Sequence, residues 1–192
     1  MITVHVDQRI NQLNKAGGFN HCIGIIILDW QDSLASLQVD LTHDHLNPLG
    51  LVHGGLYASM LDVALAMSGS YRPAPDGLYP GLTLSLTTQY TAPLQLEDGF
   101  ALAKARRTGG GKSVFFAEGQ VLAPNGRVIA SASGVGSEVS QCGVSTSRST
   151  RAHGLHPRPH VTSSRRTCPP AASRPADQPW PRLPGGDAPL QG

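Results

Sequence analysis

Residues 54–70 read GGLYASMLDVALAMSGS, and this stretch decides the fold. It is rich in Ala, Leu and Met, it contains no proline, and its side chains are small or apolar almost all round. Such a pattern predicts one long helix that is buried on most of its faces. A loop with Pro73, Pro75 and Pro80 follows and ends the helix.

Strand-like segments lie on both sides of this helix. Before it, residues 22–28 form a β-branched run and residues 34–41 alternate apolar with polar, with a polar turn at 29–33 between them. After it come four segments with a period of two, separated by hairpin-type turn signals: residues 82–90, 100–106, 113–122 and 127–135. Two strands, a buried helix and four strands in hairpin succession predict an α+β fold with an antiparallel sheet around one central helix.

The two ends of the chain differ from this domain. Residues 1–18 carry a weakly amphipathic stretch that stops at Gly17-Gly18, which predicts a short helical segment. Residues 140–192 contain seven Arg, no Lys, two Asp and nine of the fifteen prolines, without a sustained hydrophobic period. This tail is expected to be disordered. Its arginines suit an acidic partner, but Trp180 is its only aromatic residue, so nucleic-acid binding is not favoured. The abrupt change to a Pro/Arg/Ser-rich composition is equally typical of a shifted reading frame.

Cysteines, histidines and hydropathy narrow the class of protein. Cys22, Cys142 and Cys168 form no C-x-x-C pair, so neither a disulfide framework nor a zinc site is indicated. His43 and His45 lack a third ligand at a suitable spacing, and no metal is expected. The first residues lack the apolar core of a signal peptide, and no run reaches the length of a membrane span. These features predict a protein of the reducing cytoplasm.

One residue of the predicted helix is out of place. Asp62 lies between Leu61 and Val63 in an apolar run, where a carboxylate is seldom found unless it is paired or used. It could cap a neighbouring loop or pair with a buried arginine, but Arg72 is the only basic residue near it in the sequence. Asp62 is therefore a candidate catalytic carboxylate.

The start of the same helix is a second candidate site. Gly54 and Gly55 have no side chains, so a ligand can approach free backbone N–H groups where the helix dipole favours negative charge. Donors of this kind can form an oxyanion hole. The alternative is that the glycine pair only allows the helix to pack tightly against the sheet.

Both features belong to one motif. Six residues fit the pattern N-x-x-G-x-x-H-G-G-x-x-x-x-x-x-D: Asn47, Gly50, His53, Gly54, Gly55 and Asp62. The chain resembles PaaI-type thioesterases of the hotdog-fold superfamily in this motif, and the likeness extends over residues 19–139. The resemblance implies a hotdog fold, in which the sheet wraps around one long central helix. It also implies hydrolysis of acyl-coenzyme A thioesters to the free acid and coenzyme A.

The resemblance assigns roles to four residues. Asp62 would be the nucleophile or the general base that activates water. Asn47 would hold that water or the thioester carbonyl, and the Gly54 N–H would polarise the carbonyl oxygen. Thr83 stands where family members often carry a serine, so a hydroxyl is retained. No cofactor is implied, because coenzyme A is part of the substrate.

Five further residues are expected to bind substrate. His53 and Gly55 would shape the start of the helix. Arg106, Arg107 and Lys112 flank a glycine turn and could form a basic rim for the phosphates of coenzyme A, although charges on hairpin tips are usually just solvated.

Helix geometry predicts an assembly. Gly54 and Asp62 are eight residues apart, about 12 Å along a helix, which is too far for both to touch one carbonyl group. The site is therefore expected to use two subunits. Resemblance to the family implies a homodimer, often doubled into a homotetramer, in which Asn47 and Gly54 of one chain face Asp62 and Thr83 of the other.

Two other functions stay open at the level of sequence. A hotdog dehydratase or hydratase acts on similar thioesters, but such enzymes usually pair a histidine base with a carboxylate and lack this motif. A non-catalytic module could bind acyl-coenzyme A and regulate another protein, although the intact Asp62 argues against it. The acyl group cannot be read from one sequence; the resemblance makes aryl-acetyl and medium-chain acyl groups the first to test.

Overall fold

The apolar stretch at residues 54–70 forms α3 (Gly54–Ser70), as predicted, and the rest of the fold is arranged around it. The computed structural model describes residues 8–73, 81–111 and 113–138 of the 192-residue chain. The other elements are α1 (Gln8–Lys15), α2 (Phe19–Cys22), β1 (Ile25–Gln31), β2 (Leu34–Asp40), η1 (His43–His45), β3 (Gly81–Tyr90), η2 (Leu96–Asp98), β4 (Phe100–Gly110), β5 (Val114–Leu122) and β6 (Val128–Glu138).

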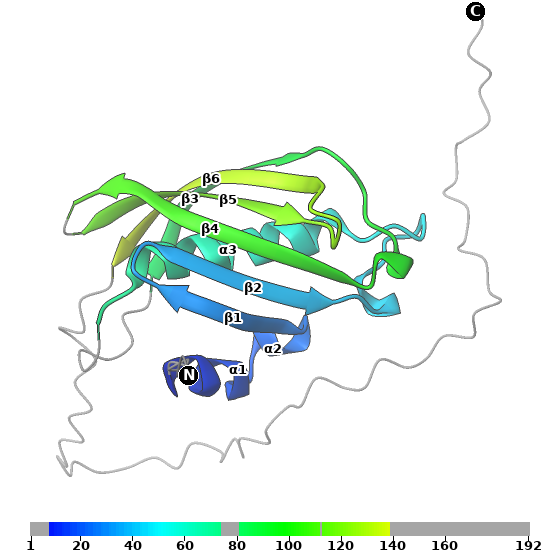
Figure 1. Ribbon diagram of the computed structural model, residues 1–192. Helices are drawn as coiled ribbons and strands as arrows, with labels where there is room; N and C mark the ends of the chain where they lie inside the picture. Colours follow the sequence, from blue (N-terminus) through cyan, green and yellow to red (C-terminus); the bar gives the residue numbers. More distant parts are fainter. Residues whose placement is uncertain (1–7, 74–80, 112, 139–192) are drawn as a thin grey trace, which may run out of the picture. The chain divides into compact units, whose positions relative to one another are not determined.

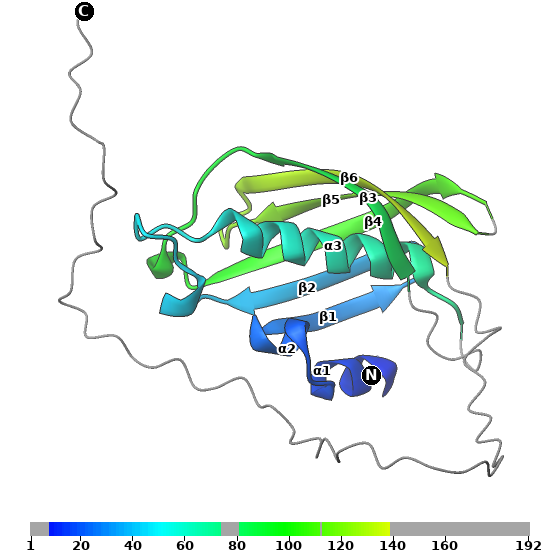
Figure 2. The same ribbon diagram turned by 180° about the vertical axis from the view of Figure 1, so that it is seen from behind.

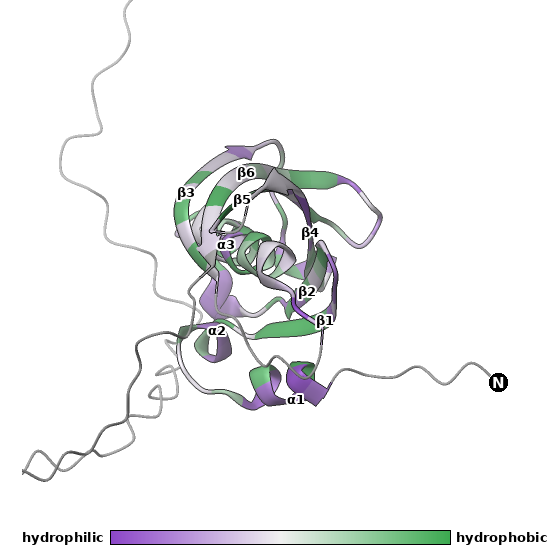
Figure 3. Cartoon of the chain, turned by 90° about the vertical axis from the view of Figure 1, so that its left-hand side faces the viewer, coloured by the Kyte–Doolittle hydropathy of each residue, from purple (hydrophilic) through white to green (hydrophobic). Residues whose placement is uncertain are grey.

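All six strands form one antiparallel sheet in the order β1-β2-β4-β5-β6-β3. The sheet curls around α3, which lies along its inner face (Figures 1 and 2). Viewed end-on, the sheet surrounds α3 from β3 to β1, and α1 and α2 lie beyond β1 (Figure 3). The predicted α+β architecture, a sheet wrapped around one central helix, is confirmed.

Glycines on the sheet, together with Gly69 of α3 itself, allow the helix to pack very close to the sheet. Phe115 is 1% exposed and fills a notch between Gly69 and Gly136, where an added Cβ would lie 2.0 Å and 2.2 Å from its ring. Leu65 is seated in the same way over Gly119 and Gly134, each of which would place a Cβ 2.8 Å from it. Side chains on these glycines would push the helix off the sheet, so close packing of this kind fixes the position of α3.

The carbonyl groups at the end of α3 are satisfied by long-range donors. The Trp30 indole N–H donates to the Met67 carbonyl at 2.8 Å, and the Arg107 guanidinium donates to the Gly69 carbonyl at 3.3 Å. The last carbonyls of a helix lack intrahelical partners, and a cation at this end also suits the helix dipole. The helix is thereby tied to both β1 and β4.

Two details of the sequence prediction were wrong. Cys22, expected in the first strand, lies in the short helix α2, because the Cys22 and Ile23 N–H groups bond back to Gly18 and Phe19 before Gly24 turns the chain at φ +70°. The four strands after α3 do not all follow one another as hairpins either, since β3 pairs with β6 and not with β4.

A crossover segment, residues 91–99, therefore connects β3 to β4 past the start of α3. Leu94 in this segment is fully buried, and its N–H donates to the Tyr57 hydroxyl at 3.1 Å. Burial raises the pKa of Tyr57 above its usual value, although the bond to Leu94 partly opposes this shift. None of the helices that the structure describes is long and apolar enough to cross a membrane.

Candidate active site

The start of α3 is held by His53, the residue before its first turn. The His53 Nδ1 atom accepts a hydrogen bond from the Gly55 N–H at 2.9 Å, which uses one of the four N–H groups that a helix start leaves without intrahelical partners. The His53 carbonyl accepts from the Leu56 N–H. Within the described part of the chain, the Gly54 N–H has no acceptor, so it is available to a ligand.

Asn47 lies in the loop that leads to this helix start. Its side-chain oxygen accepts from the Leu49 and Leu51 N–H groups at 2.9 Å and 3.2 Å. Two backbone donors require an oxygen at this position, which fixes the orientation of the amide. Gly50, at φ +77°, closes the turn and donates to the Asn47 carbonyl. The Asn47 NH₂ group has no acceptor among the described residues and is also available as a donor.

Asp62 lies in the middle of α3, and its side chain is less buried than the sequence predicted. We expected a buried carboxylate that needs compensation, but the side chain is half-buried because the sheet leaves this face of α3 uncovered between its edge strands β1 and β3. In the described residues, no hydrogen bond or ion pair involves the Asp62 carboxylate. A partly hydrated carboxylate without a partner costs little to keep and stays reactive.

Thr83 on β3 and Asp62 line the same cavity, which has a volume of about 790 Å³. The pairing of β3 with β6 shifts by one residue between Thr83 and Ser85, so the strand bulges at this point. A bulge redirects a side chain, and Thr83 thereby joins Asp62 although 21 residues separate them in sequence. The structure brings these two predicted site residues together.

The two halves of the motif remain apart within one chain. Gly54 adjoins the Tyr90 ring at the end of β3, whereas Gly81 at the other end of β3 adjoins Ala66 in the second half of α3. The stretch of helix between Gly54 and Asp62 spans about 12 Å at 1.5 Å per residue. Asn47 and Gly54 therefore do not reach a carbonyl group that Asp62 contacts in the same chain.

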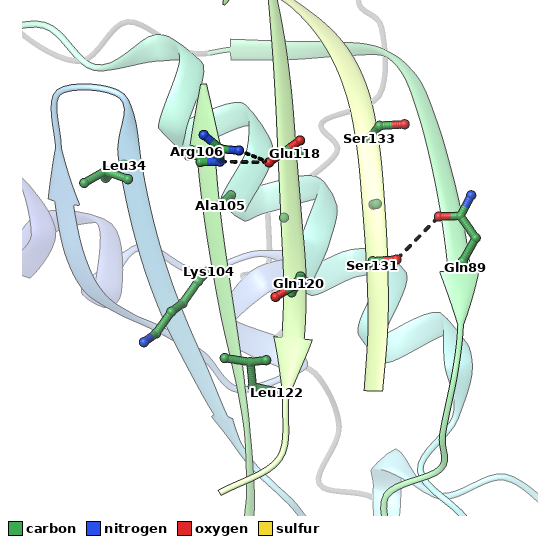
Figure 4. Close-up of a pocket in the computed structure, with 12 residues that line it drawn as sticks. Leu34, Gln89, Lys104, Ala105, Arg106, Glu118, Gln120, Leu122, Ser131 and Ser133 are labelled. Atoms are coloured by element: carbon green, nitrogen blue, oxygen red, sulfur yellow. Dashed lines mark hydrogen bonds and ion pairs between the residues drawn. The ribbon is translucent and has the colours of Figure 1, made fainter. Parts of the chain in front are cut away.

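The predicted basic rim is not near Asp62. Arg106 lies on the outer face of the sheet, where its Nε atom donates to Glu118 at 2.8 Å and both line a shallow hollow of about 520 Å³ (Figure 4). Arg107 donates to the carbonyls of Gly69, Gly109 and Gly111. Lys112 lies outside the described residues. Within one chain the structure gives both arginines structural contacts and places neither on the cavity of Asp62.

His45 anchors the loop before α3. Its Nδ1 atom accepts from the Thr42 N–H at 3.1 Å, and its carbonyl accepts from the His53 N–H at 2.8 Å. Burial lowers the pKa of His45 below its usual value. The charge of Asp44 and a hydrogen bond to the Ile23 carbonyl partly oppose this shift. The described residues contain no group of three His, Cys, Asp or Glu side chains placed to hold a metal ion.

Residues that the sequence did not single out make up most of the cavity wall. Leu13 and Asn14 come from α1, Trp30 comes from the end of β1, and Met67 comes from the last turns of α3. Trp30 was assigned to a polar turn. Contacts between the first helix and the end of α3 have no local signal in the sequence, and the only hint was a bulky aromatic residue in a turn.

Comparison with known proteins agrees with the motif. Residues 49–130, which include five of the six motif residues, match the family model described as Thioesterase superfamily. A comparison with curated protein sequences gives no significant match. The resemblance to PaaI-type hotdog thioesterases, first seen in the motif, is thereby confirmed, and solved structures agree with it.

Three solved structures illustrate the shared fold. A thioesterase from Haemophilus influenzae superposes with a TM-score of 0.63 at 15% identity, over 74% of this chain and 96% of that one. The E. coli PaaI protein from the phenylacetic acid degradation operon gives 0.61 at 18% identity, over 69% and 92%. A conserved protein from Pseudomonas aeruginosa gives 0.59 at 20% identity, over 67% and 98%. The hotdog fold is therefore established for this chain.

Proposed function

We propose that this protein hydrolyses acyl-coenzyme A thioesters, with Asp62 as the catalytic carboxylate. The match of residues 49–130 to the Thioesterase superfamily model supports hydrolysis of acyl thioesters in general. The observation that carries the finer proposal is Asp62 itself, a half-buried carboxylate without a described partner on the wall of a large, mostly apolar cavity. Such a group can reach a substrate and is not committed to the structure.

The proposed chemistry breaks the bond between the acyl carbon and the sulfur. Asp62 either removes a proton from water, whose oxygen attacks the carbonyl carbon, or attacks that carbon itself to form an anhydride that water then hydrolyses. In both routes the carbonyl oxygen gains negative charge and the sulfur leaves as a thiolate, which takes up a proton. The Thr83 hydroxyl is available to orient the attacking water.

The negative charge on the carbonyl oxygen requires donors, and we assign them to the start of α3. Neither the Gly54 N–H nor the Asn47 NH₂ group has an acceptor among the described residues, and Gly54 lies where the helix dipole favours an anion. Because about 12 Å of helix separates Gly54 from Asp62, we propose that a homodimer completes the site. Asn47 and Gly54 of one chain would face Asp62 and Thr83 of the other.

The direct test measures the release of free thiol from a panel of acyl-coenzyme A thioesters that includes phenylacetyl and straight-chain acyl groups. Turnover with at least one of them is expected. Binding of these compounds without turnover would contradict the proposal and favour a non-catalytic acyl-coenzyme A binding module. Enoyl or hydroxyacyl products without thiol release would indicate a dehydratase or hydratase.

Mixed dimers test whether the site is shared. Asp62→Asn and Asn47→Asp chains would each keep about 1% of the parental kcat or less when alone. If the site combines two chains, an equal random mixture holds mixed dimers in about half of its population, each with one intact site, and regains about a quarter of the parental activity. Unfolding and refolding the two chains together allows the exchange. No recovery, with differently tagged chains shown to co-purify as mixed dimers, would contradict a shared site.

A further inference from the structure

The cavity beside Asp62 is bordered by four parts of the chain. Its walls come from the first helices, from the free edge strand β1, from the second half of α3 and from the beginning of β3. Most of the lining is apolar and includes Ile25, Ile27, Val63 and Met67, and no lysine or arginine of the described residues contributes to it. These walls suit a hydrocarbon group and not the phosphates of coenzyme A.

Asn14 bonds the wall of the cavity that the first helices form, its N-terminal wall, to the sheet. The Asn14 side chain accepts from the Ile27 N–H at 2.8 Å and donates to the Ile27 carbonyl at 3.0 Å. The amide thus bonds to the edge of β1 as a neighbouring strand would, on the side where β1 has no strand partner. Because both bonds hold one side chain, α1 has a fixed position against β1.

Trp30 closes the cavity at the end of β1, and its ring is held on three sides. The indole N–H donates to the Met67 carbonyl at 2.8 Å, and the ring packs edge-on against Tyr71 with 5.6 Å between centroids. The Arg9 guanidinium lies 4.8 Å from the Trp30 ring centroid and 5.2 Å from that of Tyr71, while its Nη1 atom donates to the Arg72 carbonyl at 2.6 Å. Only 4% of Trp30 is exposed, so this end of the cavity is firmly closed.

The distance from Asp62 to this closed end limits the size of a ligand. Along α3 the cavity runs from Asp62 to Ser70, eight residues or about 12 Å. Met67, which bonds Trp30 through its carbonyl, lies within this stretch. A thioester whose carbonyl is next to Asp62 would therefore extend its acyl chain toward Trp30, and a chain of medium length covers the available distance.

We infer that this cavity is the acyl pocket, with the α1 segment as its outer wall and Trp30 as the residue that limits acyl length. The inference rests on the proposed thioester hydrolysis, which places the reacting carbonyl at Asp62. It adds the substrate class, a medium-chain acyl group, and one specificity-determining residue. Trp30 contacts the far end of the acyl chain and takes no part in the reaction itself.

The test compares kcat/KM over acetyl-, butyryl-, hexanoyl-, octanoyl-, decanoyl-, lauroyl- and palmitoyl-coenzyme A. The parent should favour the middle of the series. Trp30→Ala opens the end wall, so the ratio of lauroyl to hexanoyl turnover should rise about tenfold or more, on the scale at which apolar pockets distinguish methylenes. Trp30→Phe keeps most of the bulk and loses the indole N–H, so it should shift the ratio far less.

A second pair of variants tests the N-terminal wall without disturbing the core. Ala16 is exposed and lines the cavity, so Ala16→Phe should narrow it and lower decanoyl turnover about tenfold while acetyl turnover is kept. Gln12→Phe places the same side chain on α1 away from the cavity and should leave the profile unchanged. If Trp30→Ala does not fold, this pair alone decides.

Binding separates failure of the pocket from failure of the proposed function. The fluorescence of the protein comes from Trp30 and Trp180, its only two tryptophans, so the Trp30→Phe variant identifies the part due to Trp30. Decanoyl-coenzyme A added to the full-length Asp62→Asn protein should change the Trp30 fluorescence, whereas coenzyme A alone should not, and Trp30→Phe should abolish the change. A hydrolytically active parent whose chain-length profile is the same in all four variants would overturn the pocket. An inactive parent that shows the fluorescence change would overturn hydrolysis and retain the pocket.

Discussion

The start and the middle of α3 differ in how their polar groups are held. At the start, the Asn47 side-chain oxygen and the His53 Nδ1 atom each accept hydrogen bonds from backbone N–H groups of the same loop or turn. These bonds fix the directions of the two available donors, the Asn47 NH₂ group and the Gly54 N–H. In the middle, Asp62 has no described partner and lies on the wall of an apolar cavity. One region is a rigid set of donors, and the other offers a single reactive carboxylate.

In the proposed mechanism, this difference lets one short motif supply two functions. Stabilising a developing oxyanion needs donors that do not reorganise, which the bonded loop provides. Attack on a carbonyl needs a carboxylate that is accessible and not neutralised by a cation, which the uncovered side of α3 provides. Variants that separate the two regions are therefore the best test of the comparison.

Asp62→Asn should have the largest effect. The amide keeps the shape of the side chain and removes its negative charge, so kcat should fall by about 10² to 10⁴, the range for loss of a general base. Thermal stability should be unchanged, because the described residues give Asp62 no bond to lose. Asp32→Asn in the exposed β1–β2 turn is the matched control and should keep full activity. A stable Asp62→Asn protein with nearly full kcat would remove this residue from the mechanism.

Asn47→Asp should have the next largest effect on activity. An aspartate keeps an oxygen to accept from the Leu49 and Leu51 N–H groups, so the loop should stay in place. The substitution replaces the NH₂ donor by an acceptor, so kcat should fall by about 10², the scale for removal of one oxyanion donor. The measurement is steady-state kinetics together with a melting curve. Equal loss of activity and melting temperature would instead assign Asn47 a purely structural role.

How far the sequence predicted this site depends on whether a feature is local. The α3 boundaries follow from the composition of residues 54–70, and the cap formed by His53 fits the role expected for it. The prediction that Thr83 lies near Asp62 came from the resemblance to the family, since a bulge between β3 and β6 is a tertiary feature. The prediction that Asp62 is buried was wrong, because the sequence of an apolar helix does not show which of its faces the sheet leaves uncovered.

The sheet order shows the same limit. Turn signals at residues 97–99 suggested a hairpin, yet the chain crosses the start of α3 there and buries Leu94. The crossover depends on the burial of Leu94 and on the hydrogen bond between Leu94 and Tyr57. These two residues are 37 positions apart in the sequence. Turn chemistry alone does not tell which strand comes next in the sheet.

His53→Ala should have a moderate effect, mainly on stability. It removes the acceptor of the Gly55 N–H, and loss of such a cap typically lowers the free energy of unfolding by about 1 kcal/mol. Activity should fall only modestly, because the Gly54 N–H is untouched. His43→Ala in the neighbouring turn is a suitable control, since its side chain is exposed. Denaturant unfolding of both variants measures the difference, and a loss of activity as large as that of Asn47→Asp would make His53 part of the chemistry.

His45→Gln should have the smallest effect and acts only through pH. Burial keeps the pKa of His45 below its ordinary value of about 6.5, against the smaller influence of Asp44 and of the Ile23 carbonyl, so the native state favours the neutral ring. As the pH falls through about 6.5, the unfolded chain takes up a proton more readily than the native one, and stability decreases. Glutamine at this position can still reach back to the Thr42 N–H, as in a capping box, but it does not titrate. The variant should match the parent near pH 8 and lose less stability between pH 6.5 and 5, as measured by denaturant midpoints at each pH. Identical pH profiles for the two proteins would mean that His45 does not contribute to the acid sensitivity of the loop that holds the start of α3.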